Sequence, residues 1–488
     1  MPTRFIKKAF LLLSTSLLTL ASYQSQAQGP TIDPTFQPSR IFVRYSSGTT
    51  SRGTVNDVVR QPDGKYIIGG DFTEVNGVPA LNLARLNADG TPDVAYTAAC
   101  RVNDQVLALA LQSDGKVLVG GRFTTLAGNN RLVLGRLQTD GTIDESFAPP
   151  TLPLTPTNRP QVKQIVLRPD GRILVVGTFN VRGASAEPQS LVQLLSTTGQ
   201  EDASFRYISG IQGASTNQIL LQPDGKVVIA INNTSTYNPY IHRILSDGTL
   251  DGSFTPLGDY FVQSPNVLAI DKENRIYIRG LSYLQRLLPN GRGDNTFPIS
   301  SYLGSPTHLV IQPNGRLLIN TVSSVAFPNP PPGTRSLMSR LLDNGTSDPS
   351  FVSAYGPLDS SSGLVSKILV QPDGAIIAAG SFEQVGTNTG ISGLVRLLDT
   401  NVLRVASSET AARTAAWPVP AHDELHLQLE AKARPQHVSL IDALGKVVHS
   451  QAITQPELTV STAALAAGVY MLRVQYAEGM VTRRIAVQ

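Results

Sequence analysis

The stretch VVRQPDGKYII at residues 58–68 decides the fold of this chain. Apolar residues flank a short turn, in which Pro62 pre-sets φ, Asp63 binds back to the backbone and Gly64 takes positive φ. Each copy predicts two strands joined by a tight turn, and the apolar runs beside the turn predict strands buried on both faces. The pattern recurs as LALQSDGKVLV (109–119), IVLRPDGRILV (165–175), ILLQPDGKVVI (219–229), LAIDKENRIYI (268–278), LVIQPNGRLLI (309–319) and ILVQPDGAIIA (368–378).

The centre of each copy is a structural turn. In the fifth copy Asn274 replaces glycine, and asparagine also tolerates the left-handed conformation. The other predicted turn residues are Asp63, Gly64, Asp114, Gly115, Asp170, Gly171, Asp224, Gly225, Asn314, Gly315, Asp373 and Gly374.

A second motif, Arg-Leu-x-x-Asp-Gly-Thr-x-Asp-x-x-Phe, follows each first one. It predicts another strand, turn and strand, so that each period holds about four short antiparallel strands, which is typical of one propeller blade. The copies are RLNADGTPDVAY (85–96), RLQTDGTIDESF (136–147), a weaker LLSTTGQEDASF (194–205), RILSDGTLDGSF (243–254), RLLPNGRGDNTF (286–297) and RLLDNGTSDPSF (340–351).

The two ends of the repeat region complement each other. The last copy begins as RLLDT at Arg396 and stops, and its missing half stands near the N-terminus as GPTIDPTF, residues 29–36. A closed ring needs its first and last strands in one blade, because an open ring leaves unpaired edges. Residues 28–400 therefore predict an all-β, seven-bladed β-propeller in which residues 29–36 complete the seventh blade.

The N-terminus predicts export. Arg4, Lys7 and Lys8 precede an apolar run at residues 9–20, and Ser25-Gln26-Ala27 offers small residues for cleavage, so residues 1–27 are predicted to be a signal peptide. Its removal lowers the formal charge of the 488-residue chain from +4 to about +1, which argues against a nucleic-acid partner. No later stretch is long enough for a transmembrane segment, so a soluble mature chain is expected. Cys100, the single cysteine, is expected to be a small buried residue.

The two linked motifs resemble the delta-60 repeat family of secreted bacterial proteins over roughly residues 29–400. The resemblance implies a propeller-like repeat array and implies no particular activity.

Sequence variation in this array is collected on one face. The Asp-Gly turns lie on one side of the disc, whereas the connections that vary in length lie on the other, and variable loops on a rigid scaffold commonly bind ligands. Aromatic rings there would stack on sugars or anchor a protein partner, unless they pack between the blades. The candidate binding residues are Tyr207, Tyr237, Tyr240, Tyr260, Phe261, Tyr302 and Tyr355.

Charged residues recur without forming a catalytic or metal cluster. The second-motif aspartates are predicted to serve their turns, since one carboxylate per turn is a poor calcium site. Arg292-Gly293-Asp294 occupies an ordinary turn of this motif. No catalytic residue, metal or cofactor is therefore predicted. A basic residue also follows the first turn in six repeats, usually two positions after the turn aspartate: Lys65, Lys116, Arg172, Lys226, Arg275 and Arg316. Except for the copy with Asn314, each is predicted to pair locally with a carboxylate of its own turn.

These features favour a secreted or cell-surface propeller that acts as a binding or adhesion module, with a glycan or a surface protein as partner. Two alternatives stay open. One is an extracellular carbohydrate-active enzyme, a glycan lyase or hydrolase, with acids such as Glu74, Asp259 or Glu383. The other is a structural surface-layer protein.

After Thr400 the repeats end. Residues 401–412 read as a linker, and residues 413–488 predict a small β-sandwich with alternating Leu425, Leu427 and Leu429. This tail resembles the type A C-terminal sorting domain of type IX secretion. The resemblance implies handling by the outer-membrane translocon, removal of the tail, and release of the cargo or its attachment to lipopolysaccharide. The motif positions are Trp417, Pro418, Pro420, Asp423, Asp442, Gly445, Gly468 and Tyr470, of which Trp417 departs from the tyrosine usual in the family.

Overall fold

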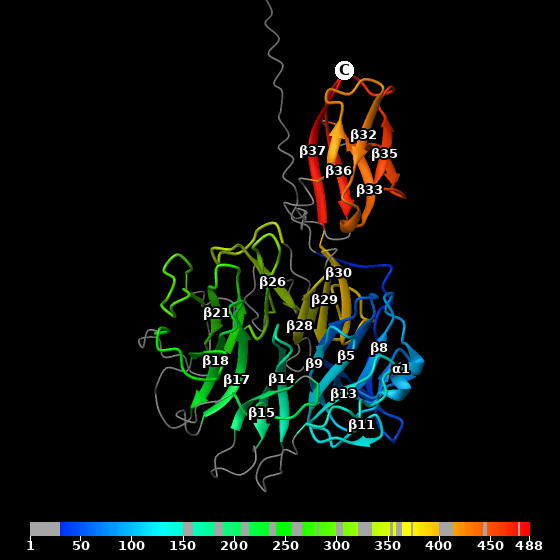
Figure 1. The fold of residues 1–488 in the computed structure, drawn as a ribbon. Coiled ribbons are helices and arrows are strands. Elements are labelled where there is room, and N and C mark those ends of the chain that lie inside the picture. Colours follow the sequence, from blue (N-terminus) through cyan, green and yellow to red (C-terminus); the bar gives the residue numbers. More distant parts are fainter. Residues whose placement is uncertain are drawn as a thin grey trace, which may run out of the picture.

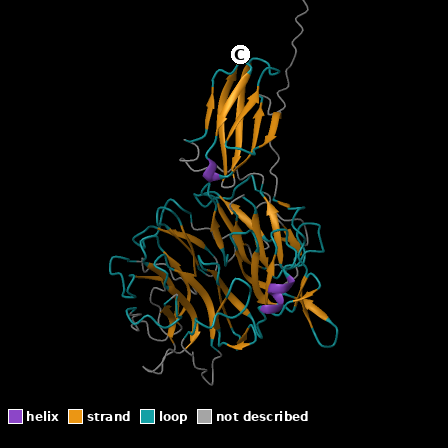
Figure 2. Cartoon of the chain, turned by 45° about the vertical axis from the view of Figure 1, so that its right-hand side comes forward, coloured by secondary structure: helices purple, strands orange, loops and turns teal. Residues whose placement is uncertain are grey.

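The structure, a computed structural model, consists almost entirely of β-strands (Figure 2). Figure 1 shows a broad lower part, formed by described residues between 30 and 399, and a smaller upper part formed by residues from 413 onward. Within the described part, the only helical elements are α1 (Val94–Ala99) and the short 3-10 turn η1 (Ala431–Ala433). The described residues are 30–149, 160–179, 189–195, 197–205, 214–233, 241–255, 266–280, 283–298, 306–320, 334–351, 355–357, 364–371, 374–399, 413–442, 447–476 and 479–488.

Seven sheets, each built on three antiparallel strands, follow one another along the lower part. They are β4 (Thr54–Arg60), β5 (Tyr66–Asp71) and β8 (Leu83–Leu86); β9 (Val106–Leu111), β10 (Val117–Gly121) and β13 (Leu134–Leu137); β14 (Gln161–Leu167), β15 (Ile173–Phe179) and β16 (Gln189–Leu194); β17 (Ala214–Leu221), β18 (Val227–Asn233) and β19 (Ile241–Ile244); β20 (Asn266–Ile270), β21 (Ile276–Arg279) and β22 (Leu284–Leu287); β23 (Leu309–Ile311), β24 (Leu317–Asn320) and β26 (Met338–Leu341); β28 (Val365–Val370), β29 (Ile376–Gly380) and β30 (Leu394–Leu398).

The first strands of these sheets form the inner layer. Each first strand lies against the first strand of the next sheet, and β28 of the seventh sheet lies against β4 of the first. Within the described residues, the first strands thus form a continuous inner layer, which confirms the all-β propeller class predicted from the repeats.

The Asp-Gly turn joins the first and second strands of a sheet. In the first sheet Gly64 N donates to Gln61 O at 3.0 Å, and Asp63 Oδ1 accepts from Lys65 N at 3.1 Å. Gly64 has a φ of 91° and Asn274, its counterpart in the fifth sheet, has a φ of 59°. The turns thus place glycine or asparagine where other side chains would be strained. Asp373 lies outside the described residues.

The last quarter of each repeat is shorter than predicted. After the third strand, the chain makes only an isolated bridge, such as Leu86 to Pro92 in the first sheet. Asp93 then caps α1 by accepting from Tyr96 N. In the second sheet Asp144 accepts from Ser146 N at 3.1 Å instead. The aspartate turns the backbone away from the sheet, so a full fourth strand does not form.

The seventh sheet differs because the N-terminal segment completes it. Strand β1 (Thr31–Ile32) pairs antiparallel with β30, with Thr31 opposite Leu398 and Ile32 opposite Leu397. Asp33 N also donates to Arg396 O at 3.0 Å. The beginning and the end of the repeat region thus share one sheet.

Short strands extend several connections at the sheet ends opposite the Asp-Gly turns. We call these ends the loop side and the ends with the Asp-Gly turns the turn side. Strands β6, β7, β11 and β12 come from hairpins between second and third strands, whereas β2 and β3 precede the first sheet. The bounds are β2 (Ile41–Arg44), β3 (Thr50–Arg52), β6 (Glu74–Val75), β7 (Val78–Pro79), β11 (Thr125–Leu126), β12 (Asn129–Asn130), β25 (Thr334–Ser336) and β27 (Tyr355–Pro357).

Apolar side chains fill the space between neighbouring sheets. Ile377 and Ala379 of the seventh sheet share one buried cluster with Val55 and Ile68 of the first. The sheets approach so closely that a Cβ on Gly69 would lie 2.4 Å from Val106 Cγ1. Close packing of consecutive sheets therefore depends on a glycine in β5.

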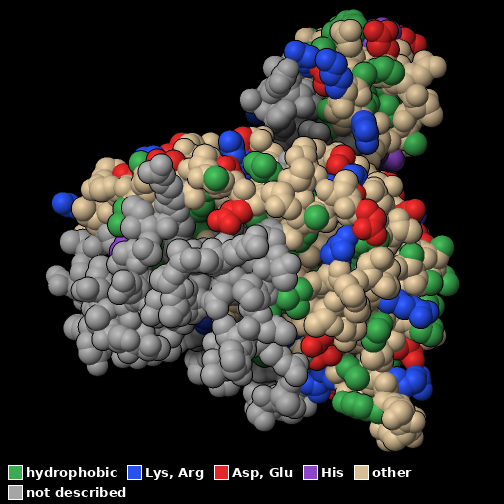
Figure 3. All heavy atoms as spheres, turned by 60° about the horizontal axis from the view of Figure 1, so that its bottom comes forward, with side chains coloured by type: hydrophobic (Ala, Val, Ile, Leu, Met, Phe, Trp, Pro, Cys, Tyr) green, Lys and Arg blue, Asp and Glu red, His purple; other side chains and the backbone are tan. Residues whose placement is uncertain are grey.

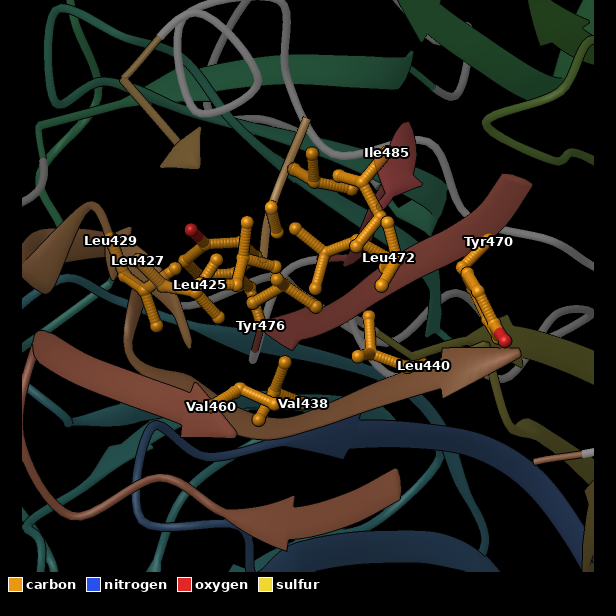
Figure 4. Close-up of a cluster of buried hydrophobic side chains, with 14 of the residues drawn as sticks. Leu425, Leu427, Leu429, Val438, Leu440, Val460, Tyr470, Leu472, Tyr476 and Ile485 are labelled. Carbon is orange, nitrogen blue, oxygen red and sulfur yellow. The ribbon is translucent and has the colours of Figure 1, made fainter. Parts of the chain in front are cut away.

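The C-terminal part is a separate β-sandwich with its own core (Figure 4). Leu425, Leu427 and Leu429 alternate into this core, where they meet Leu440 and Tyr476 of the facing sheet. The described residues contain no helix long and apolar enough to span a membrane. One sheet consists of β31 (Ala415–Trp417), β32 (Glu424–Gln428) and β35 (Glu457–Ser461), and the other of β34 (Val447–Ala452), β33 (Pro435–Ile441), β36 (Gly468–Tyr476) and β37 (Gly479–Val487).

Candidate functional site

On the turn side, an arginine of the third strand binds the aspartate of the same second motif. Arg340 has a fully buried side chain, and its Nε lies 2.7 Å from Asp348 Oδ2. Its other nitrogens donate to Ser350 Oγ at 3.2 Å and to Asp399. These carboxylates are neutralised by arginine, which leaves them unsuited to binding calcium. The same contact joins Arg85 to Asp93, Arg136 to Asp144, Arg243 to Asp251, Arg286 to Asp294 and Arg396 to Asp33.

The same arginines also reach the neighbouring sheet. Arg286 NH1 donates to Asp343 O at 2.6 Å, and Arg243 NH1 donates to Pro289 O at 2.6 Å. The aromatic residue that ends the motif packs there too: a Cβ on Gly345 would lie 2.8 Å from the Phe297 ring. We call this set of contacts the inter-sheet lock. It holds the turn side rigid by joining each sheet to the next.

The lock also joins the seventh sheet to the first. Gln37 N donates to Asp89 O at 2.6 Å, and the Phe36 ring lies 3.0 Å from the position of a Cβ on Gly90. Phe36 also meets Tyr66 edge to face, with ring centroids 5.8 Å apart. The junction between the chain ends thus uses the chemistry of the other junctions.

The third sheet builds its lock from exchanged residues. The register of the strands places Gln193 where the second sheet has Arg136, because the third sheet has one extra residue in the following turn. Arg168 stands where the second sheet has Gln112. Gln193 Nε2 donates to Asp202 Oδ2 at 2.9 Å, while Arg168 NH1 donates to Gln193 Oε1 at 3.2 Å and to Ser246 O at 3.4 Å. In this sheet Arg168, just before the first turn, supplies the guanidinium group in place of a third-strand arginine. The hydrogen bond to the next sheet is kept, because Arg168 donates to Ser246 O.

The basic residues after the first turns join the same network. They were predicted to pair with their own turn carboxylates, yet Lys65 and Lys116 pair with Asp93 and Asp144 of the second motif, at 3.1 and 2.9 Å. Arg172 contacts both kinds of carboxylate, Asp170 at 3.0 Å and Asp202 at 2.7 Å. The prediction of ion pairing is right and the choice of partner is wrong for Lys65 and Lys116, because the second-motif carboxylate is the more buried acceptor.

The lock lowers the pKa of its carboxylates. Hydrogen bonds, first from the Ser204 hydroxyl and then from Gln193 and Arg172, lower the pKa of Asp202 to about 2. Burial acts to raise the pKa of Asp144, but hydrogen bonds from Ser146, Lys116 and Arg136 outweigh it and hold the pKa well below its usual range. Both groups are therefore ionised over the whole physiological range.

The structure describes little of the predicted aromatic site. Six of the candidates lie outside the described residues: Tyr207, Tyr237, Tyr240, Tyr260, Phe261 and Tyr302. Tyr355 begins β27, which pairs with β25. The acid Asp259 also lies outside the described residues.

A cleft of about 1080 Å³ lies between the seventh and first sheets. It is bounded by residues 387–391, which connect β29 to β30 on the loop side, and by β1, β2 and β6. Its lining includes apolar surface, from Ile32, Pro34, Phe42 and Ile391, and the charged side chains of Arg40 and Glu74. Sequence reasoning missed this cleft, because its walls come from segments more than 300 residues apart in the chain.

The two described acids of the enzyme alternative are both ion-paired. Glu74, which lines the cleft, accepts from Arg44 Nε and lies 2.7 Å from Arg44 NH2. Glu383 lies 3.0 Å from Arg52 Nε. Both carboxylates are thus engaged by an arginine side chain.

Two other potentially reactive side chains of the lower part are Cys100 and His308. Cys100 is fully buried as expected, and burial raises the pKa of its thiol to about 12. Burial lowers the pKa of the His308 imidazole to about 4, and the positive charge of Lys367 lowers it by a smaller amount. Within the described ranges, no group of three or more metal-binding side chains occurs.

The predicted sorting-motif residues span both sheets of the C-terminal sandwich. Trp417 ends β31 and leaves 46% of its surface exposed, with its ring 6.0 Å from that of His426. Tyr470 is buried and donates its hydroxyl to Ala466 O at 2.8 Å. The Trp417–Pro418 and Val419–Pro420 bonds are cis. Asp423 O accepts from Thr462 N at 2.7 Å, Asp442 follows β33, Gly468 begins β36, and Gly445 lies outside the described residues.

Fold and lock together define a repeat protein of the β-propeller class that ends in a β-sandwich tail. Five segments match the family described as "Domain of unknown function (DUF5122) beta-propeller": residues 61–96, 112–147, 168–205, 222–254 and 371–398. Residues 415–488 match the "Secretion system C-terminal sorting domain". The chain therefore carries repeats of this propeller family, as the delta-60 resemblance implied, and a type IX C-terminal sorting domain. That tail directs the protein to the cell surface or the exterior.

A comparison with curated proteins finds no match. Among solved structures, the chain is similar to the extracellular domain of a protein described as a hybrid two-component system of B. thetaiotaomicron, with 12% identity, a TM-score of 0.44, and coverage of 92% of this chain and 58% of that one. For PorZ, a surface component of the type IX secretion system of Porphyromonas gingivalis, the identity is 13%, the TM-score 0.43 and the coverages 89% and 59%. The chain thus spans about three fifths of these two proteins. For virginiamycin B lyase of Staphylococcus aureus the values are 16%, 0.41, 74% and 99%.

Proposed function

We propose that this protein is a secreted or cell-surface propeller that acts as a binding or adhesion module, with the loop side as its contact surface. One observation carries the proposal: on the turn side, the third-strand arginines and the second-motif aspartates are paired with each other in the inter-sheet lock, as for Arg340 and Asp348. The connections that vary in length are on the loop side. A rigid ring with one variable side is the usual arrangement for presenting binding loops.

The cleft between the seventh and first sheets supports a glycan as ligand. Its walls combine the half-buried Phe42 ring and two prolines with the exposed Arg40. An aromatic or proline surface packs against the apolar face of a sugar ring, while charged groups bind its hydroxyls. Glu74, the acidic residue of the cleft wall, is ion-paired with Arg44. The cleft is therefore better suited to binding a glycan than to cleaving it.

We also propose the route and the organisation of the chain. Residues 1–27 form a signal peptide, the type IX translocon and sorting machinery then handle the tail, and residues 401–412 link the tail to the ring. Residues 28–400 make up one seven-bladed ring, with residues 29–36 completing the last blade. The pairing of β1 with β30 supports this count.

A glycan array with the mature chain, residues 28–488, tests the binding function. We expect a small set of retained glycans, and we expect Arg40→Gln and Phe42→Ala to weaken their binding about tenfold. Lys272→Gln is the matched control, because Lys272 is 89% exposed and lies in a first turn on the turn side.

Each outcome discriminates between the functions. Cleaved products in the bound fraction would show that the protein is a glycan lyase or hydrolase and not only a binding module. Ordered multimers that retain no glycan and no surface protein would indicate a structural surface-layer protein.

A further inference from the structure

The innermost strands share an irregularity near their loop-side ends. In six of the seven sheets, the register with the second strand shifts after one to three paired residues, which leaves one extra residue of the first strand unpaired. Such bulges re-aim a side chain and are common beside binding sites. The extra residues are Asn56 in β4, Leu107 in β9, Lys163 in β14, Asn217 in β17, Leu268 in β20 and Ser366 in β28.

Lys163 is the one charged member of this set. Its neighbours in β14 point to the adjacent sheets: Val162 packs against Gly120 of the second sheet, and Gln164 bonds Ile219 of the fourth. The bulged Lys163 between them is left at the inner edge of its sheet, partly buried. No carboxylate among the described residues pairs with it.

Arg122 places a second cation nearby. It directly follows β10, at the loop-side end of the second sheet, and its Nε donates to Gln161 Oε1 of β14 at 3.0 Å. Its backbone N donates to Gln105 O at 2.9 Å. Burial lowers the pKa of Lys163, and the positive charge of Arg122 lowers it further, so the two groups repel each other.

Two other charged groups, Lys367 of β28 and Asp71 of β5, have an ion-pair partner and a hydrogen-bond partner, respectively. Lys367 Nζ lies 3.1 Å from Asp57 Oδ1, and Asp71 Oδ2 accepts from Gln105 Nε2 at 2.6 Å. Lys163 and Arg122 therefore form a positive pair between the second and third sheets that no carboxylate among the described residues neutralises. A pair of this kind is stabilised by an anion.

We propose that Lys163 and Arg122 form an oxyanion-binding site at the loop-side end of the inner layer, which takes a carboxylate or sulfate group of an acidic glycan. The site rests on the proposed binding function and narrows it to charged glycans. Arg122 offers a planar set of donors fixed by Gln161, while Lys163 offers a mobile ammonium group, and together they hold an oxyanion from two sides.

The test is titration of the mature chain with a polyuronate, with dextran sulfate and with neutral dextran. We expect either acidic polymer to bind and neutral dextran not to bind, with affinity falling as salt rises. The polyuronate and dextran sulfate arms distinguish carboxylate from sulfate. Lys163→Gln and Arg122→Gln should each weaken binding about tenfold, whereas Lys163→Arg should retain it. Lys272→Gln on the turn side should change nothing.

Equal binding by Lys163→Gln and the unmodified chain would overturn the site. So would retention of neutral dextran as tightly as the acidic polymers. If the glycan array shows binding that these variants leave intact, the binding function stands and the oxyanion site fails. If the array shows no binding of any kind, the proposed function itself fails. Thermal melting of each variant confirms that lost affinity does not reflect unfolding, and Lys163→Arg tests the site if Lys163→Gln does not fold.

Discussion

At the residue scale, the lock depends on which position supplies the guanidinium. In the second sheet Arg136 binds Asp144 at 2.7 Å and contacts Gln112 at 3.3 Å. In the third sheet the glutamine and the arginine have exchanged places, as Gln193 and Arg168 show. The sequence contains this exchange, but nothing in the sequence states that the two positions touch.

The exchange predicts a compensating pair of substitutions in the second sheet. Arg136→Gln alone leaves Asp144 without its buried partner, and we expect it to cost about 3 kcal/mol of unfolding free energy. Adding Gln112→Arg recreates the arrangement of the third sheet and should recover about half of that loss. Urea denaturation of the single and double variants measures the coupling. Strict additivity would contradict it, and Lys116→Gln, a control at a more exposed member, should cost less than about 1 kcal/mol.

At the element scale, β1 is only two residues long, yet it closes the seventh sheet. Its pairing with β30 removes an exposed edge. The residues that follow it, Asp33 and Phe36, place the lock at the junction with the first sheet. Although it is short, β1 contributes to the stability of the ring because it lies where the two ends of the repeat region meet.

Removal of residues 29–36 should therefore destabilise the whole ring. We expect the deletion to lower the Tm of the lower part by roughly 5 °C or more, because both a strand and a lock are lost. The double variant Asp33→Ala/Phe36→Ala keeps the strand and should show an intermediate Tm. Calorimetry distinguishes the three proteins, and an unchanged Tm in the deletion would mean that the ring does not close through β1.

At the scale of the whole molecule, stability rests on many equivalent carboxylates. The pKa of each is lowered in the folded state, so they titrate within one pH range. They are Asp33, Asp93, Asp144, Asp202, Asp251, Asp294 and Asp348.

A cooperative loss of stability in acid follows. A lowered folded-state pKa means that the stabilisation is complete above the ordinary value of 3.8 and is lost as the pH falls through the folded-state value, about 2 for Asp202. We expect the Tm of the ring to be nearly constant from pH 7 to about 5 and to fall steeply between about pH 4 and 2. Thermal melts across this range provide the measurement. Ser204→Ala should shift part of the loss to higher pH, and a Tm independent of pH would refute the role of the lock.

The sequence by itself determined the repeats, the turns, the propeller class and the sorting tail. It could do so because glycine at positive φ and alternating or continuous apolar runs are local requirements, visible within about a dozen residues. Gly64 and Leu425 are read correctly for this reason.

Only the tertiary structure decided which charged side chains pair with each other. Lys65 pairs with Asp93 and not with its own turn carboxylate, and Glu74 pairs with Arg44 at the cleft. Lys163 has the positive charge of Arg122 beside it and no carboxylate partner among the described residues. These outcomes depend on distances across sheets and on which carboxylate is the more buried. Ion pairing and desolvation act through space, so the spacing of residues along the chain carries no record of them.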